Sequence, residues 1–95
     1  MFYVYILHSS LLNQFYIGFT SNLEQRLELH LNPTENRKFT AKAKDWKISF
    51  KIECETKTQA LAIEKHIKNM KSKVYIENLL RYAEISIKLL EKYKV

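Results

Sequence analysis

The segment from Trp46 to Cys54 alternates apolar and polar side chains without a break. Its apolar positions are Trp46, Ile48, Phe50, Ile52 and Cys54, and Lys47, Ser49, Lys51 and Glu53 stand between them. A period of two is the pattern of a strand that buries one face and leaves the other in water. The chain is therefore expected to form a sheet and to cover one of its faces.

Two further strands are predicted near the start of the chain. Phe2 to Leu7 is apolar or aromatic on both faces, which indicates a strand with both sides at least partly covered. A loop from His8 to Gln14 and a strand from Phe15 to Thr20 complete a hairpin, in which Tyr5 and Tyr16 can be neighbours.

Helix signals follow the predicted strands. Ser21 with Glu24, and Thr56 with Gln59, have the spacing of a capping box, and apolar residues at helical spacing follow each of them. The first helix is expected to stop at Asn32-Pro33, after about ten residues. The stripes Val74, Ile76, Leu79, Leu80 and Ile85, Leu89, Leu90 predict a third and a fourth helix.

These elements define an α+β fold. The predicted order is β-β-α-β-α-α-α, with a small three-stranded antiparallel sheet flanked by helices. A chain of 95 residues has room for one core. We expect residues 1–82 to form the domain proper and residues 83–95 to be a C-terminal helical extension of it.

The charge of the chain favours a polyanionic partner. Sixteen Lys and Arg against ten Asp and Glu leave a net charge of +6, which suits nucleic acid first and an anionic membrane surface second. No apolar run is long enough for a membrane span and no signal peptide is recognisable, so the expected location is cytoplasmic. Cys54, the single cysteine, is expected to be a buried thiol, and no zinc site is indicated.

Gly18 is the only glycine, where average composition would give about six or seven. A position that keeps its one glycine is expected to need a backbone angle or a close approach that a Cβ would forbid. Gly18 closes the triplet Tyr16-Ile17-Gly18, whose first residue, Tyr16, follows Tyr5 by eleven residues. The tyrosines beside it are candidates either for the core or for chemistry.

Several motifs, taken together, resemble the GIY-YIG nuclease superfamily from about Phe2 to about Leu80. They are Tyr3-Val4-Tyr5, Tyr16-Ile17-Gly18, Asn22-Leu23-Glu24-Gln25-Arg26-Leu27 with His30 one turn beyond Arg26, and Ala62-Ile63-Glu64-Lys65-His66-Ile67-Lys68. The chain looks most like the small single-domain members of that superfamily. Two departures are visible: Tyr3 replaces a glycine of the first motif, and Phe19 stands where some members have a lysine near the metal.

The resemblance implies a metal-dependent endonuclease that hydrolyses DNA with low sequence specificity, with repair or recombination as a setting. Tyr5 would be the general base, Tyr16 would orient water or phosphate, and Arg26 would bind phosphate through its guanidinium. His30 would shuttle a proton, and Glu64 would hold one Mg²⁺ or Mn²⁺. Asn78 is the candidate for a supporting asparagine, with Asn69 second.

Two basic segments flank the proposed site in the order of elements. A basic loop lies between Pro33 and Asp45, and a lysine-rich stretch runs from Lys65 to Lys73. We expect duplex DNA, or branched and other structured DNA, to run between them. The nucleic-acid-binding candidates are Arg37, Lys38, Lys42, Lys44, Lys65, Lys68 and Lys71.

Three alternatives stay open at this level. The basic segments can be solvated faces that only confer solubility, and the chain can be a nucleic-acid-binding module that has lost turnover. It can also be an interaction protein that uses Ile85, Leu89 and Leu90 as a dimer seam. The expected oligomeric state is a monomer or a weak homodimer.

Overall fold

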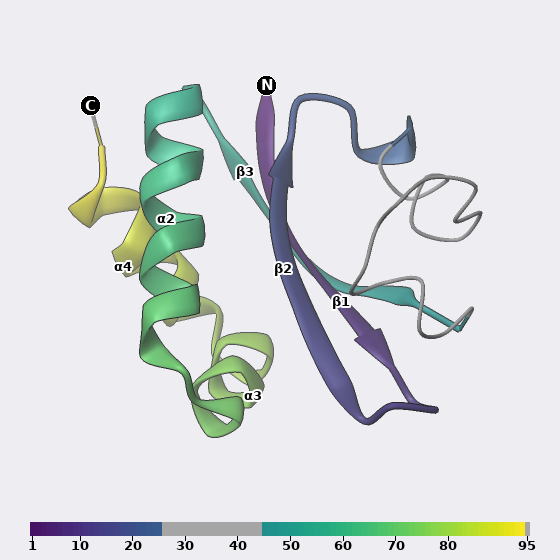
Figure 1. Ribbon diagram of the computed structural model, residues 1–95. Coiled ribbons are helices and arrows are strands. Elements are labelled where there is room, and N and C mark those ends of the chain that lie inside the picture. Colours follow the sequence, from purple (N-terminus) through teal and green to yellow (C-terminus); the bar gives the residue numbers. More distant parts are fainter. Residues whose placement is uncertain (26–44, 95) are drawn as a thin grey trace.

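The computed structural model describes residues 1–25 and 45–94 and contains one three-stranded antiparallel sheet (Figure 1). The strands are β1 (Phe2–Ser9), β2 (Gln14–Thr20) and β3 (Lys47–Cys54), in the spatial order β2-β1-β3. The first strand is therefore central and pairs along both of its edges. All three predicted strands are confirmed.

Three helices follow β3, as predicted: α2 (Lys57–Met70), α3 (Lys73–Arg81) and α4 (Ala83–Lys92). The Thr56 side chain accepts a hydrogen bond from the Gln59 backbone N–H, which confirms that cap. Ser72 caps α3 in the same way.

The cap of the helix that begins at Leu23 lies one residue later than predicted. The Asn22 side chain, not that of Ser21, accepts the hydrogen bond, and its donor is the Gln25 N–H at 3.2 Å. Thr20 Oγ1 accepts from the Asn22 N–H and so orients this residue at the end of β2. The sequence could not separate the two candidates, because Asn and Ser are similarly good N-caps and are adjacent here.

The sheet has two faces with different partners. One face, which we call the helical face, includes Val4, Ile6 and Ile52 and packs against Ala60, Ile63 and Ile67 of α2. Ile76 of α3 and Leu89 of α4 complete this core, and Figure 1 shows the three helices together on one side of the sheet. The opposite face, which we call the tyrosine face, carries Tyr3, Tyr5 and Leu7 from β1.

A β-bulge in β3 changes the face to which its first residues belong. Ile6 pairs with Phe50 and Leu7 with Ile48, so Ser49 is the extra residue. Trp46 is consequently buried with Tyr5 and Leu7, and Ile48 is 39 % exposed. The expectation of one continuous apolar face from Trp46 to Cys54 was wrong, because an inserted residue reverses the alternation on one side of it.

A hydrogen-bonded latch joins the β1–β2 turn to the residue that leads into β3. Ser9, which is fully buried, donates from Oγ to Asp45 Oδ1 at 2.6 Å, and the Leu11 N–H donates to Asp45 Oδ2 at 2.8 Å. The bond from Ser9 has the larger effect and that from Leu11 the next, and both lower the pKa of the Asp45 carboxyl. The latch fixes the approach of the chain to Trp46.

The apolar residues of α4 that could have formed a dimer seam face the core of this chain. Leu89 is buried, and Ile85 and Leu90 pack against the same helical-face core. Gln59 of α2 also donates from Nε2 to the Leu90 carbonyl at 2.9 Å. These residues therefore take part in the core of the monomer, and a dimer seam built from them stays a prediction.

No helix within residues 1–25 and 45–94 is long and apolar enough to cross a membrane.

Candidate functional site

Tyr5, Tyr16 and Gly18 lie together on the tyrosine face. Tyr5 is the direct partner of Gly18 across the β1–β2 pair, and the ring centroids of Tyr5 and Tyr16 are 6.4 Å apart. A Cβ on Gly18 would stand 2.5 Å from Tyr5 Oη and 2.7 Å from Cζ. Gly18 does not have a positive φ, so the close approach of the phenol is what requires glycine.

The two phenols differ in their access to solvent. Tyr5 is 2 % exposed, whereas Tyr16 on the edge strand β2 is partly exposed. The Tyr5 hydroxyl therefore sits inside the structure against Gly18 of β2, and Tyr16 is the more accessible of the two phenols.

Trp46 completes this cluster, and sequence reasoning missed it. Its ring meets that of Tyr16 edge-on at a centroid distance of 6.5 Å, and it is buried together with Tyr5 and Leu7. The signal that could have located it is the bulge, which only the pairing of β3 with β1 reveals. Trp46 limits the positions that the Tyr16 ring can adopt.

Glu64 approaches the sheet from the other layer. It lies on α2, which packs on the helical face, and its side chain is 16 % exposed. Lys68, one turn further along α2, donates from Nζ to Glu64 Oε1 at 2.9 Å. Glutamate N-terminal to lysine at this spacing is the favourable order for such a pair.

The Glu64–Lys68 pair lies on the flank of α2 that borders β2. Lys68 and Ile67 line one hollow together with Phe15 and Ile17 of β2. β2 is an edge strand, so this flank of α2 lies beside one edge of the sheet. Phe19 packs against the helical-face core, so residue 19, where some members have lysine, adds an apolar side chain here.

Not every predicted residue joins this arrangement. Asn78 lies on α3, where its backbone carbonyl accepts from the Tyr82 N–H at 2.8 Å. This helix belongs to the layer that covers the helical face, opposite the tyrosine face. Several candidates lie outside the described residues: Arg26, His30, Arg37, Lys38, Lys42 and Lys44.

The lysines of α2 are not equivalent. Lys68 and Lys71 line the hollow beside β2, to which Lys73 of α3 also contributes. Lys65 is exposed and is not part of that lining. The basic end of α2 is thus its C-terminal end.

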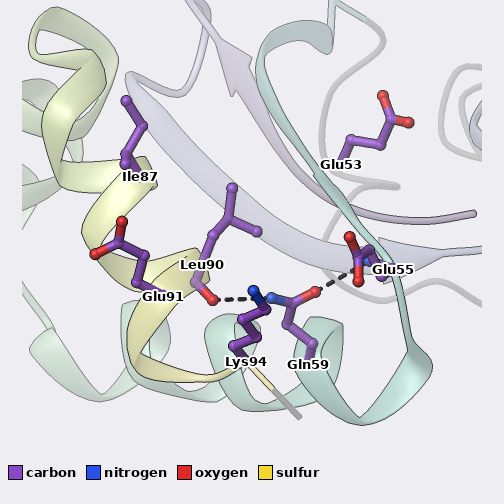
Figure 2. Close-up of a pocket in the computed structure, with 7 residues that line it drawn as sticks. All are labelled: Glu53, Glu55, Gln59, Ile87, Leu90, Glu91 and Lys94. Carbon is purple, nitrogen blue, oxygen red and sulfur yellow. Dashed lines mark hydrogen bonds between the residues drawn. The ribbon is translucent and has the colours of Figure 1, made fainter.

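The other end of α2 has the opposite charge. A hollow of about 240 Å³ lies between the N-terminal part of α2 and α4, and Gln59 bridges its walls by bonds with the Glu55 N–H and the Leu90 carbonyl (Figure 2). Its charged lining is Glu53, Glu55, Glu91 and Lys94. A surface with three carboxylates and one ammonium repels a phosphate backbone, so this hollow is excluded as a nucleic-acid site.

The described residues contain no group of three or more His, Cys, Asp or Glu side chains arranged to hold a metal ion. Within these ranges Glu64 is the carboxylate that the resemblance assigns to a metal, and water or substrate oxygens would be further ligands. The hard donor oxygens of Glu64 fit such a role for Mg²⁺ or Mn²⁺.

Comparison with known proteins agrees with the fold and with the extent of the resemblance. The family model described as the GIY-YIG catalytic domain matches residues 1–78, which include both strand motifs and Glu64. No curated protein and no solved structure matches the chain. A match over most of the chain, together with a β2-β1-β3 sheet and the helices that follow it, shows that the protein belongs to the GIY-YIG family of nuclease domains.

Proposed function

We propose that this GIY-YIG domain is a divalent-metal-dependent endonuclease that hydrolyses DNA with low sequence specificity. The observation that carries the proposal is the seating of the Tyr5 hydroxyl against Gly18, beside the partly exposed Tyr16. A glycine kept for the close approach of a phenol, in a chain with one glycine, supports a constrained tyrosine pair. A general hydrophobic face would not need that constraint.

The exposure of the two phenols supports a division of labour. Tyr16 is the phenol that solvent and a phosphodiester can reach, and we give it the contact with the attacking water. Tyr5, 2 % exposed, would hold the tyrosine pair in place from behind. Tyr5, for which the sequence resemblance implies the general base, thereby takes a positioning role, and Tyr16 keeps the contact with water.

Glu64 would hold the cation on the β2 side of the sheet. When bound, Mg²⁺ or Mn²⁺ supplies positive charge to the phosphoryl oxygens. Lys68 now occupies Glu64 Oε1, so the ammonium must share that carboxylate or move to a neighbouring phosphate. Arg26 remains the proposed phosphate ligand and His30 the proposed proton shuttle.

The test compares nicking of plasmid DNA by the wild type and by matched variants. Glu64→Gln and Tyr16→Phe are each expected to lower the single-turnover rate by about 10²-fold or more. Glu77→Gln is the control, because Glu77 is an exposed glutamate of α3 and its loss should leave the rate unchanged. Mg²⁺-dependent nicking that persists in Glu64→Gln at the wild-type rate would contradict the proposal.

A second function is favoured by one observation. Tyr5 is buried, and Glu64 is engaged by Lys68 in the layer on the opposite side of the sheet. Such an arrangement also fits a nucleic-acid-binding module without turnover. DNA binding that weakens with salt, with no cleavage in Mg²⁺ or Mn²⁺, would favour this function over the first.

A further inference from the structure

A groove beside the turn from α2 to α3 has a lining of two kinds. We call it the corner groove; its volume is about 320 Å³, and it lies between this turn and strand β2. Its apolar lining is Phe15, Ile17, Ile67 and Ile76. Its charged lining is Lys68, Lys71 and Lys73, with no acidic residue.

The lysines are positioned by the surrounding backbone. Lys73 donates from Nζ to the Asn13 carbonyl at 3.1 Å, which ties α3 to the β1–β2 turn across the groove. Lys71 ends α2 in the left-handed conformation, with φ 47°, and its N–H donates to the Lys68 carbonyl. Three cations are therefore gathered from two helices around one apolar hollow.

Charge and shape together select the occupant. A DNA backbone alone would need the cations but not the apolar surface, and an apolar ligand alone would not need the cations. An unpaired nucleotide has both parts, since its phosphates are anionic and its base has an apolar face that stacks on an aromatic ring such as that of Phe15.

The groove is continuous with the proposed catalytic carboxylate. Glu64, Lys68 and Lys71 are spaced i, i+4 and i+7, so they follow one flank of α2, about 6 and 10 Å from the first to the second and third. The phosphates of one DNA strand advance about 3.4 Å each along the helix axis. Lys68 contacts Glu64 itself, whereas Lys71, about 10 Å further along α2, aligns with a phosphate two to three nucleotides from one held at Glu64.

We propose that the corner groove binds one unpaired nucleotide of the DNA substrate, two to three nucleotides from the bond that is cut. The phosphates of that nucleotide lie against Lys71 and Lys73, and its base lies on Phe15 and Ile17. This inference rests on the proposed nuclease function, because Glu64 fixes the origin of the distance. It names a substrate class: duplex DNA with an extrahelical base.

The first experiment measures binding without catalysis. Two fluorescently labelled duplexes, one fully paired and one with a single bulged adenosine, are titrated in EDTA with the wild type and with the Lys71→Gln/Lys73→Gln variant. The control is Lys88→Gln/Lys94→Gln, whose lysines lie on α4 and just beyond it. The wild type should bind the bulged duplex about tenfold more tightly than the paired one. Lys71→Gln/Lys73→Gln should lose most of that preference, and so should Phe15→Leu; the control should keep it.

The second experiment locates the cut. In Mg²⁺ or Mn²⁺, the wild type should cleave the bulged duplex two to three nucleotides from the bulge, on one side of it. Cuts scattered evenly along the duplex would overturn the proposal while leaving the nuclease function intact.

Two binding results would also overturn it. One is equal affinity for the bulged and paired duplexes. The other is a set of three findings with oleate: it does not displace DNA, it binds the wild type but not the Lys71→Gln/Lys73→Gln variant, and that variant keeps the wild-type DNA affinity. The groove would then be a site for an anionic lipid. A bulge preference without cleavage in any metal supports the groove and removes only the nuclease function.

Discussion

At the scale of single residues, Gly18 and Tyr5 depend on each other. The phenol occupies the space that a Cβ would take, and Tyr5 is itself enclosed by Leu7 and Trp46. The ring cannot retreat without disturbing that cluster. The one glycine of the chain is thus explained by packing, and not by backbone conformation.

Gly18→Ala is therefore expected to destabilise the protein by about 1–3 kcal/mol, the usual cost of forcing extra atoms into a packed core. In a Tyr5→Leu background, where the clashing atoms are gone, the same change should cost clearly less. Urea unfolding of the four proteins of this cycle measures the difference. An equal cost of Gly18→Ala in both backgrounds would show that the contact with Tyr5 is not the cause.

Much of the candidate site was predictable residue by residue, for a local reason. Tyr5, Tyr16 and Gly18 fall on adjacent strands at fixed spacing, so the hairpin alone brings them together. Glu64 could be assigned to a helix edge but not to a layer, because helix packing is a long-range property. The proximity of the Tyr5 hydroxyl to Gly18 was also hidden, since sequence does not give a side-chain direction.

At the scale of elements, α2 links the two halves of the molecule. One of its flanks carries Glu64 and Lys68 toward β2. Another carries His66, whose Nδ1 lies 2.8 Å from the Tyr93 hydroxyl and whose ring is 6.1 Å from that of Tyr75. Residues from α2, α3 and the end of α4 thus meet around one imidazole.

This cluster predicts a pH-dependent stability. Burial first, and the Lys92 ammonium second, lower the pKa of His66 below its ordinary value of 6.5. The unfolded chain therefore takes up a proton at His66 before the folded protein does, so stability is lost as pH falls from about 7.5 through 6.5. The urea midpoint should fall between pH 7.5 and 5.5, above the range in which most carboxylates titrate.

His66→Asn isolates the group responsible. The variant should show a smaller drop in midpoint over the same pH interval, while the control His8→Asn, which changes an imidazole of β1 that lies against Phe15, should retain the wild-type drop. An unchanged drop in His66→Asn would assign the pH dependence to another histidine.

The elements themselves were predictable in type and order, and the reason is that their signals are local. Thr56 caps its helix as the pattern indicates. The face of Trp46 was not predictable, because the extra residue at Ser49 is defined only by pairing with β1. The cap was predicted at Ser21 and lies at Asn22, because only the structure shows which of the two side chains accepts from the Gln25 N–H.

At the scale of the whole molecule, charge is unevenly placed along α2. The end that meets β3 and α4 is acidic, with Glu53, Glu55 and Glu91, and the end that meets α3 is basic. Polarity of this kind orients an approaching polyanion before contact. It favours DNA arriving at the corner groove and β2.

Glu53→Gln/Glu91→Gln tests this polarity by raising the net charge by two far from the corner groove. DNA affinity should rise a few-fold at low salt and match the wild type at physiological salt, because separations beyond about 8 Å are then screened. The slope of log affinity against log salt near physiological salt should stay unchanged, since no phosphate contact is added. A steeper slope there would mean that DNA touches the acidic end.

The bulge at Ser49 makes the length of this part of the chain as informative as its composition. Deleting that one residue would restore an unbroken alternation of faces along β3. Trp46 and Ile48 would then both move to the opposite face of the sheet, although no other residue had changed. In related chains, an insertion or deletion at this point would therefore move the tryptophan from the tyrosine face to the helical face. The face on which residue 46 lies therefore depends on the number of residues between it and Phe50. Sequence identity alone would not reveal a change of face.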